Sequence, residues 1–303
     1  MDFKQLESFI MVMERGSFSR AAACLYLTQP TVSAHIASLE KELGVRLFAR
    51  TTKEVKPTRA GETFVTYARD MLTLRDSAAA ALGDFEKAVE GGVMIGASSI
   101  PEKYFLPEIM AAFNERYPQV SFQVYAGDSE RVIARLAAGE LDLALTGTLL
   151  QESKCLFRPL TEDRLAVITP KDDVFLRYQE KGFPPDELCR FPFISREKGS
   201  GTRRELEEYL RSQNVDPLGL TVVAESSSTE SIKMMVAQGL GVAVISRSAA
   251  ADYAEFGRLE AFDFQPRPLE RTLYIARRKN APLSGAARSF FDFAADYYGG
   301  KQR

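Results

Sequence analysis

The sequence has few of the side chains that usually carry enzyme chemistry. Its 303 residues contain one histidine, His35, and three cysteines, Cys24, Cys155 and Cys189, which lie far apart without a CxxC spacing. A single histidine excludes most histidine-based catalytic and metal-binding constellations, so we predict no catalytic site, no metal site and no cofactor. In a reducing cytosol we interpret the cysteines as buried or tolerated rather than disulfide-bonded, with a redox-sensing thiol as the alternative.

Long apolar runs are also absent. No run of about 18 uninterrupted apolar residues occurs, which argues against a transmembrane helix. The first 16 residues, MDFKQLESFIMVMERG, mix charged and apolar side chains and lack the apolar core of a secretory signal. We therefore expect a cytoplasmic protein, and the length predicts two or three cores.

The charges are unevenly distributed along the chain. Residues 1–60 hold nine Lys and Arg against six Asp and Glu, whereas the rest of the chain holds 30 against 35. A basic module on an acidic body predicts a polyanionic partner for the first part only.

Residues 1–43 show the periodicity of three short helices. Apolar side chains recur at helical spacing from residue 3 to residue 13 and stop at Gly16, which fits a C-cap. Ser17 or Ser19 can cap a second helix, and Thr28 can cap a third that ends at Gly44. Two helices joined by a tight turn predict a helix-turn-helix.

The polar face of the third helix is free to enter the major groove of double-stranded DNA. His35 lies on this face, where we expect it to influence operator preference; the alternative is a solvated surface histidine. The DNA contacts predicted for this region come from helix caps and polar-face residues: Ser17, Ser19, Thr28, Gln29, Pro30, Thr31, Ser33, His35 and Ser38.

Residues 45–60 have the pattern of a short basic hairpin, as in a wing. We assign Arg50, Lys53, Lys56 and Arg59 to phosphates or the minor groove, where they give affinity and salt dependence rather than sequence choice. The alternative is that these charges only solvate the hairpin. The predicted DNA-binding domain is 1–60.

No proline interrupts a helical run from about Ala60 to Glu90. The apolar spacing in this run is that of a coiled-coil seam. We predict a linker and dimerisation helix over 61–91; the alternative is a helix packed on its own domain. The seam residues are Tyr67, Met71, Leu74, Ala78, Ala81 and Phe85.

Strand-like and helical segments alternate beyond residue 92, which predicts parallel sheets covered by helices. We expect an effector domain over 92–303, with lobe I at 92–162 and 268–303 and lobe II at 163–267. The predicted strands are 93–97, 120–125, 141–146, 165–169, 220–224, 242–246 and 271–276. The predicted helices lie near 102–116, 128–138, 201–213, 229–239, 247–254 and 284–298.

Small polar residues follow several predicted strands and precede helices. Two helix N-termini that face each other across a cleft bind a small anion well, and ligands collect at the carboxyl ends of strands. Ordinary helix capping is the alternative explanation. The predicted effector contacts are Ser98, Ser99, Ile100, Pro101, Gly147, Thr148, Ser200, Gly201, Thr202 and Ser228.

The segments SFSRAA, LTQPTVSAHIASLEKELGVRLFAR and PTRAGE resemble the signature of LysR-type transcription regulators, and REKGSGTRRELEEYL follows at the expected interval. The resemblance implies a multidomain fold: an all-α winged helix-turn-helix, a long linker helix and a two-lobed α/β effector domain similar to periplasmic binding proteins. It also implies a homotetramer built as a dimer of dimers, and contact with RNA polymerase. The family usually has a small polar residue or proline at positions 100–101; here Ile100 and Pro101 make part of the rim apolar, and Pro101 has no N–H.

The segments ISREKGSGTR and STESIK resemble a branch of the family associated with sulfur assimilation and selenium metabolism, which implies a sulfur or selenium oxyanion as effector; a carboxylate would use the same donors. Two other classes were weighed. A periplasmic solute-binding protein does not explain the helix-turn-helix, and an enzyme lacks a nucleophile elbow, a metal cluster or a GxGxxG motif. We predict a DNA-binding transcription regulator modulated by a small anionic effector, and not an enzyme.

Overall fold

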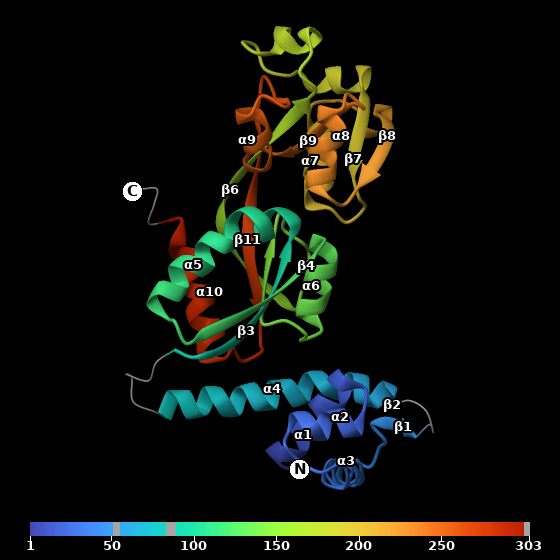
Figure 1. Cartoon of the computed structure of the whole chain (residues 1–303), viewed down its shortest axis with the longest axis vertical. Coiled ribbons are helices and arrows are strands. Elements are labelled where there is room, and N and C mark those ends of the chain that lie inside the picture. The colour runs from blue at the N-terminus through green and yellow to red at the C-terminus, as the bar shows by residue number, and fades with distance from the viewer. Residues whose placement is uncertain (51–54, 83–88, 300–303) are drawn as a thin grey trace. The chain divides into compact units, whose positions relative to one another are not determined.

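The computed structural model describes residues 1–50, 55–82 and 89–299. The chain divides into two compact units, one formed mainly by residues 1–88 and the other by most of the remaining chain (Figure 1). Within the described ranges, no helix combines the length and apolar character needed to cross a membrane.

The N-terminal unit consists of three short helices, a two-stranded antiparallel hairpin and a long helix (Figure 1). Ser17 and Thr28 cap the second and third helices as expected, each accepting a hydrogen bond from a backbone N–H three residues on. Gly16 and Gly44 end two of the helices with φ of 59° and 70°, which glycine adopts without strain. The elements are α1 (Phe3–Arg15), α2 (Phe18–Cys24), α3 (Gln29–Leu43), β1 (Phe48–Arg50), β2 (Val55–Pro57) and α4 (Arg59–Leu82).

A shared apolar core joins these elements. The buried Phe9 ring of α1 lies 5.5 Å from the Phe48 ring of β1 and 5.3 Å from the Phe64 ring of α4. The Glu40 carboxylate on α3 accepts hydrogen bonds from the backbone N–H groups of Leu47 (2.7 Å) and Phe48 (3.1 Å). The start of the hairpin is therefore fixed directly to α3.

The second unit is built on one nine-stranded sheet, in its described part, with the strand order β4-β3-β5-β11-β6-β9-β7-β8 and with β10 beside β6. β3, β4 and β5 belong to one lobe, and β7, β8 and β9 to the other (Figure 1). The elements are β3 (Gly91–Ser98), η1 (Pro101–Phe105), α5 (Leu106–Arg116), β4 (Val120–Gly127), α6 (Ser129–Ala137), β5 (Leu143–Thr146), β6 (Cys155–Thr169), η2 (Asp173–Tyr178), η3 (Pro185–Arg190), β7 (Pro192–Arg196), α7 (Gly201–Ser212), η4 (Pro217–Gly219), β8 (Thr221–Ser226), α8 (Thr229–Ala237), β9 (Val242–Ser246), α9 (Arg247–Glu255), β10 (Glu260–Asp263), β11 (Leu269–Arg278) and α10 (Gly285–Tyr297).

The expectation of purely parallel sheets is wrong. The pairs β3–β4, β3–β5, β7–β8 and β7–β9 are parallel, but β11 runs antiparallel to β5 and β6, and β6 runs antiparallel to β9 and β10. The predicted crossing at 161–165 lies inside the unbroken strand β6. The lobes are thus joined by two long strands, β6 and β11 (Figure 1).

Each lobe has its own apolar core, and η1 connects the two. In the first lobe Phe113 packs against Phe122 and Phe290, with ring centroids 6.0 and 5.1 Å away. Ile100, which precedes the π-helical turn η1, is instead buried in the core of the second lobe, and Tyr104 of η1 packs against that core. A segment that follows β3 therefore anchors itself in the opposite lobe.

Candidate functional site

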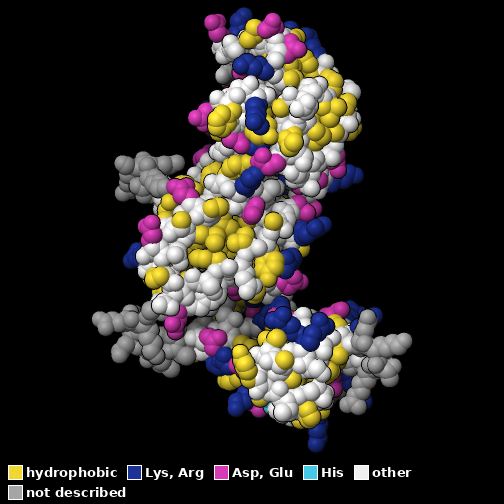
Figure 2. Space-filling model, viewed as in Figure 1, with side chains coloured by type: hydrophobic (Ala, Val, Ile, Leu, Met, Phe, Trp, Pro, Cys, Tyr) yellow, Lys and Arg dark blue, Asp and Glu magenta, His cyan; other side chains and the backbone are white. Residues whose placement is uncertain are grey.

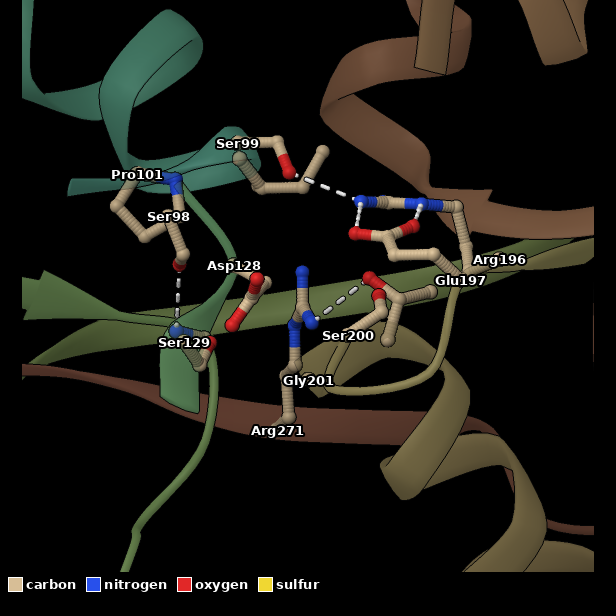
Figure 3. A pocket seen from close by; sticks show the side chains of 13 residues that line it. Ser98, Ser99, Pro101, Asp128, Ser129, Arg196, Glu197, Ser200, Gly201 and Arg271 are labelled. Atoms are coloured by element: carbon tan, nitrogen blue, oxygen red, sulfur yellow. Dashed lines mark hydrogen bonds and ion pairs between the residues drawn. The ribbon is translucent and has the colours of Figure 1, made fainter. Parts of the chain in front are cut away.

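A small polar cavity lies at the carboxyl ends of β3, β5 and β7, where side chains from both lobes meet (Figure 3). Its volume, measured with a water-sized sphere, is about 10 Å³, which is room for roughly one water molecule. The lining residues are Ser98, Ser99, Ile100, Pro101, Asp128, Ser129, Gly147, Arg196, Glu197, Ser200, Gly201, Thr202 and Arg271.

Two of the predicted effector residues do not line this cavity. The Thr148 hydroxyl donates a 2.5 Å hydrogen bond to Glu205, and the residue lies in a neighbouring groove beside α7. Ser228 caps α8, where its hydroxyl accepts the Ser231 backbone N–H at 3.2 Å. Ordinary capping, the alternative considered above, describes Ser228. The predicted residues that the fold brings to the cavity are Ser98, Ser99, Ile100, Pro101, Gly147, Ser200, Gly201 and Thr202.

Several of the predicted hydroxyls are already engaged with the protein. Ser98 accepts the Gly147 backbone N–H at 3.2 Å, and Thr202 accepts a hydrogen bond from Arg271 Nη1 at 3.0 Å. Ser99 accepts one from Arg196 Nη2 at 2.9 Å. These side chains hold the cavity walls together, so a ligand would meet hydroxyls that already accept a hydrogen bond from the protein.

One fully buried hydroxyl without a partner belongs to a residue that sequence reasoning missed. Ser129 is 1% exposed, and within the described part of the chain its Oγ is the one buried side-chain polar atom without a hydrogen-bond partner. Leaving such a group unsatisfied costs about 1–3 kcal/mol, so it needs a physical explanation. A ligand atom in the cavity provides one.

Two helix N-termini meet at Ser129: that of α7 was predicted, whereas that of α6 takes the place of the one expected after Ser98. Ser129 begins α6, and Gly201 begins α7 in the other lobe; a Cβ placed on Gly201 would lie 3.3 Å from Ser129 Oγ. A side chain at Gly201 would therefore require its neighbours to shift by a few tenths of an ångström. The segment after Ser98 contributes the π-helical turn η1 instead, and Pro101 has no N–H to donate.

Two buried arginines complete the cavity, and both were missed. Arg271 on β11 reaches into it beside the Asp128 carboxylate (Figure 3). Its Nε and Nη2 atoms donate to Asp163 at 2.9 and 2.7 Å, and Asp163 also accepts the Ser246 hydroxyl at 2.6 Å. The sequence alone does not single out Arg271, because β11 also carries Glu270, Arg277 and Arg278 at exposed or half-buried positions.

Arg196 ends β7 and is 4% exposed. The Glu197 carboxylate accepts from its Nε atom at 2.8 Å and from Nη2 at 3.0 Å (Figure 3). The lining thus carries Arg196 and Arg271 against Asp128 and Glu197, with Asp163 directly behind Arg271. The sequence predicted a positively charged site, but carboxylates of the protein itself balance the charges of the two arginines.

A larger cleft adjoins the cavity, because the two share Ser99, Asp128 and Glu197. Its volume is about 570 Å³, within the range of small-molecule sites. The cleft is lined by Ser99, Glu102, Ala126, Gly127, Asp128, Arg131, Glu197, Lys198, Glu225 and Ser227.

The predicted DNA-contacting residues lie mainly on the surface of the N-terminal unit. Thr31 and Ser17 are half-buried, Lys53 lies outside the described residues, and only the backbone of Arg50 is described, in β1. On the face shown in Figure 2, Lys and Arg dominate part of this unit, whereas both signs mix on the second unit. The exposed predicted residues are Ser19, Thr28, Gln29, Pro30, Ser33, Ser38, Lys56 and Arg59.

His35 fits neither of its two predicted roles simply. Its ring is half-buried, and Nδ1 lies 2.8 Å from the hydroxyl of buried Ser8 on α1. His35 lies three residues after Val32 and four before Leu39, beside the buried stripe of α3, so its side chain reaches the neighbouring helix. A contact with DNA at this position remains a prediction.

Comparison with known proteins identifies the family. A model described as "Bacterial regulatory helix-turn-helix protein, lysR family" matches residues 3–62, and "LysR substrate binding domain" matches residues 86–299. The chain is 34% identical to a probable RuBisCO transcriptional regulator of Cyanophora paradoxa, over 95% of this chain and 89% of that protein. The chain belongs to the LysR family: it is a DNA-binding transcription regulator with an effector-binding domain.

Solved structures agree with this assignment. A full-length OxyR variant from Pseudomonas aeruginosa has a TM-score of 0.80 and 26% identity, covering 98% of this chain and 94% of that one. The CcmR regulatory domain of Synechocystis PCC6803 in complex with 2-PG has a TM-score of 0.62 and 25% identity, covering 69% and 97%. The similar relatives are RuBisCO and CmpR regulators rather than sulfur-assimilation regulators, so the resemblance to a sulfur or selenium branch is not supported.

Proposed function

We propose that this regulator senses a small metabolite carrying a carboxylate or phosphate group, bound in the cavity and cleft between its lobes. The observation that carries the proposal is the unpartnered, buried Ser129 hydroxyl, which lies where the first turns of α6 and α7 converge beside Arg271. Hydroxyl, guanidinium and helix N-terminal N–H groups are all hydrogen-bond donors to anionic oxygen.

The two compartments set the size of this ligand. The cavity, with room for about one water-sized atom, accepts one oxygen of the anionic group, and the adjoining cleft of about 570 Å³ accepts the rest of the molecule. A related regulatory domain was solved with 2-PG. We therefore place 2-PG and small carboxylates ahead of the sulfur and selenium oxyanions expected from the sequence.

DNA recognition in this proposal uses the polar face of α3 and the basic hairpin, in a dimer joined through α4. Tyr67 and Leu74 on α4 are 62% and 59% exposed, whereas Met71 packs partly against the core of its own unit. Tyr67 and Leu74 are thus available to a partner helix, whereas part of the Met71 side chain is used by the core of its own unit. Phe85 lies outside the described residues. Assembly of two dimers into a tetramer, and contact with RNA polymerase, belong to the same proposal.

Thermal unfolding with added ligands tests the effector site. We expect 2-PG, or a small carboxylate, to raise the stability saturably, by about 2.7 kcal/mol at a ligand concentration 100-fold above Kd. Ser129→Ala removes the unpartnered donor and should weaken that ligand's binding about tenfold, the size of one lost hydrogen bond. Operator binding in the absence of ligand should remain unchanged. If phosphate, sulfate, 2-PG and carboxylates all leave the unfolding temperature unchanged, the anionic effector is wrong.

A further inference from the structure

Arg196 is the one lining residue of the cavity whose guanidinium is held by its own sequence neighbour. Glu197 takes up two N–H groups of the fork, at 2.8 and 3.0 Å. The same guanidinium donates to Ser99 of the first lobe at 2.9 Å and to Thr229 of the second lobe at 3.4 Å. Arg196 therefore bridges the two lobes. The carboxylate of Glu197 occupies the Nε–Nη2 side of the same guanidinium.

The charges around the cavity do not favour an additional anion as they stand. Two guanidinium groups face three carboxylates, those of Asp128, Asp163 and Glu197. A further negative charge in this enclosed space would be repelled by all three unless one of them leaves. An anionic effector thus requires a carboxylate that can move.

Of the three, Glu197 is the one whose carboxylate binds only the guanidinium that the effector would occupy: among the described residues, its hydrogen bonds and ion pair are all to Arg196. Asp163 is 1% exposed and binds Arg271 through two N–H groups as well as the Ser246 hydroxyl. Asp128 accepts the Arg131 backbone N–H at 2.7 Å and so holds the first turn of α6. The Glu197 side chain is 20% exposed and lines both the cavity and the open cleft.

We propose that Glu197 is an internal stand-in for the effector, and that the effector's carboxylate or phosphate binds by displacing it from Arg196. This inference rests on the proposed effector site. The displaced side chain turns into the cleft, whose lining offers Lys198 and Arg131 as partners beside the carboxylates of Glu102, Asp128 and Glu225. Glu197 then determines specificity, because a ligand binds only if its anionic group competes with a carboxylate that is always present.

Chemical rescue with formate tests the exchange without knowledge of the effector. Glu197→Ala in the full-length protein leaves the buried Arg196 without its carboxylate, so we expect a lower unfolding temperature. Formate should restore it saturably, by about 2–4 °C more than it raises the wild type. The double variant Glu197→Ala, Arg196→Gln should show no such gain.

A matched control separates the site from a general salt effect. Glu208→Ala removes a comparable carboxylate from Arg204, in an exposed ion pair outside the cavity with Nε and Oε1 3.0 Å apart. Formate should not stabilise this variant beyond the wild type. If formate acts equally on all variants, or does not act on Glu197→Ala, Arg196 is not an exchangeable anion site and the inference is overturned. Glu197→Gln, which keeps the shape of the side chain, serves the same test if the alanine variant does not fold.

Calorimetric binding of 2-PG and inorganic phosphate gives the second readout. Glu197→Gln should bind them at least about tenfold more tightly than the wild type, because the charged competitor is gone. Equal or weaker binding would contradict displacement. If formate rescues Glu197→Ala but neither protein binds 2-PG or phosphate, the exchange stands and the proposed ligand class fails. If 2-PG or phosphate stabilises the wild type without formate rescue, the effector proposal stands and the role of Glu197 fails.

Discussion

Two buried serines of the second unit differ in whether the side-chain hydroxyl has a hydrogen-bond partner. Ser129 Oγ has no hydrogen-bond partner in the described part of the chain, whereas Ser246 Oγ donates to Asp163 at 2.6 Å. Both side chains are nearly inaccessible, at 1% and 0% exposed. Position and burial alone therefore do not separate a structural hydroxyl from one that is available to a ligand.

We predict opposite stability effects for Ser129→Ala and Ser246→Ala. Removing the unpartnered Ser129 hydroxyl should leave the free energy of unfolding unchanged or raise it slightly, since no bond is lost. Removing the Ser246 hydroxyl should lower it by about 1–3 kcal/mol, because Asp163 loses a charge-assisted hydrogen bond. Urea unfolding monitored by circular dichroism measures both, and equal losses would show that Ser129 has a structural partner.

Cys155 should be chemically inert in the folded protein. Burial, with a smaller contribution from Glu152, raises the pKa of its thiol from 9.0 to about 11. The reactive thiolate is therefore about a hundredfold scarcer at neutral pH than at an unperturbed cysteine. Iodoacetamide labelling followed by mass spectrometry should modify the exposed Cys24 first and Cys155 only after unfolding. Labelling of Cys155 at the rate of Cys24 would contradict this and revive the redox-sensing alternative.

Sequence reasoning located the cavity better than it identified the groups that face a ligand. Ser98 and Thr202 were predicted because each lies where a strand meets a helix, a local pattern. Arg196 and Ser99 are 97 positions apart, and Arg271 and Asp163 are 108 apart, so their pairing exists only once the sheet has formed. A local sequence pattern therefore does not indicate which serine or threonine hydroxyls accept hydrogen bonds from Arg196 and Arg271.

At the scale of elements, the junction between the hairpin and α4 leaves no space for a side chain at Gly61. A Cβ at this position, in the first turn of α4, would lie 2.2 Å from the Leu47 carbonyl oxygen. The carbonyl belongs to the backbone just before β1, so it cannot swing aside as a flexible side chain could. The helix is therefore seated directly against the start of the hairpin.

Gly61→Ala should destabilise the N-terminal unit by about 1–3 kcal/mol, the usual cost of overpacking, and should weaken operator binding because the hairpin moves away from α3. Gly285→Ala is the matched control, since nothing lies within 4 Å of a Cβ there. It should be neutral or slightly stabilising in α10. Thermal unfolding and fluorescence anisotropy with operator DNA distinguish the two variants; equal behaviour would mean that the junction adapts.

Helices were predicted well because their caps are local signals. Ser17 and Thr28 accept the backbone N–H bonds that the sequence indicated, and α7 begins at Gly201 as expected. The strands β7 and β10 were missed because each has only two consecutive apolar residues, Phe193–Ile194 and Ala261–Phe262, between proline or polar ends. The antiparallel role of β6 and β11 was missed because alternation of strands and helices does not reveal direction.

At the scale of the whole molecule, exposed apolar side chains on α4 predict self-association. Leu74→Glu places a charge at a position that is 59% exposed on the predicted seam, and it should raise the dimer dissociation constant at least tenfold. Leu218→Glu, at a position that is 92% exposed on η4, is the control and should have no effect. Sedimentation velocity over a range of concentrations measures both. Unchanged association of the Leu74 variant would indicate that α4 is not the dimer contact.

The two long strands that the lobes share also determine how this protein can move. β6 and β11 are hydrogen-bonded to each other from the pair Leu269 and Leu165 to the pair Arg278 and Cys155. This continuous ladder restrains the separation of the two lobes. The ladder is irregular only between Leu273 and Tyr274, and such bulges increase local twist. Arg271 lies two residues from this point. The irregular point of the ladder that joins the two lobes therefore lies beside a residue that lines the cavity.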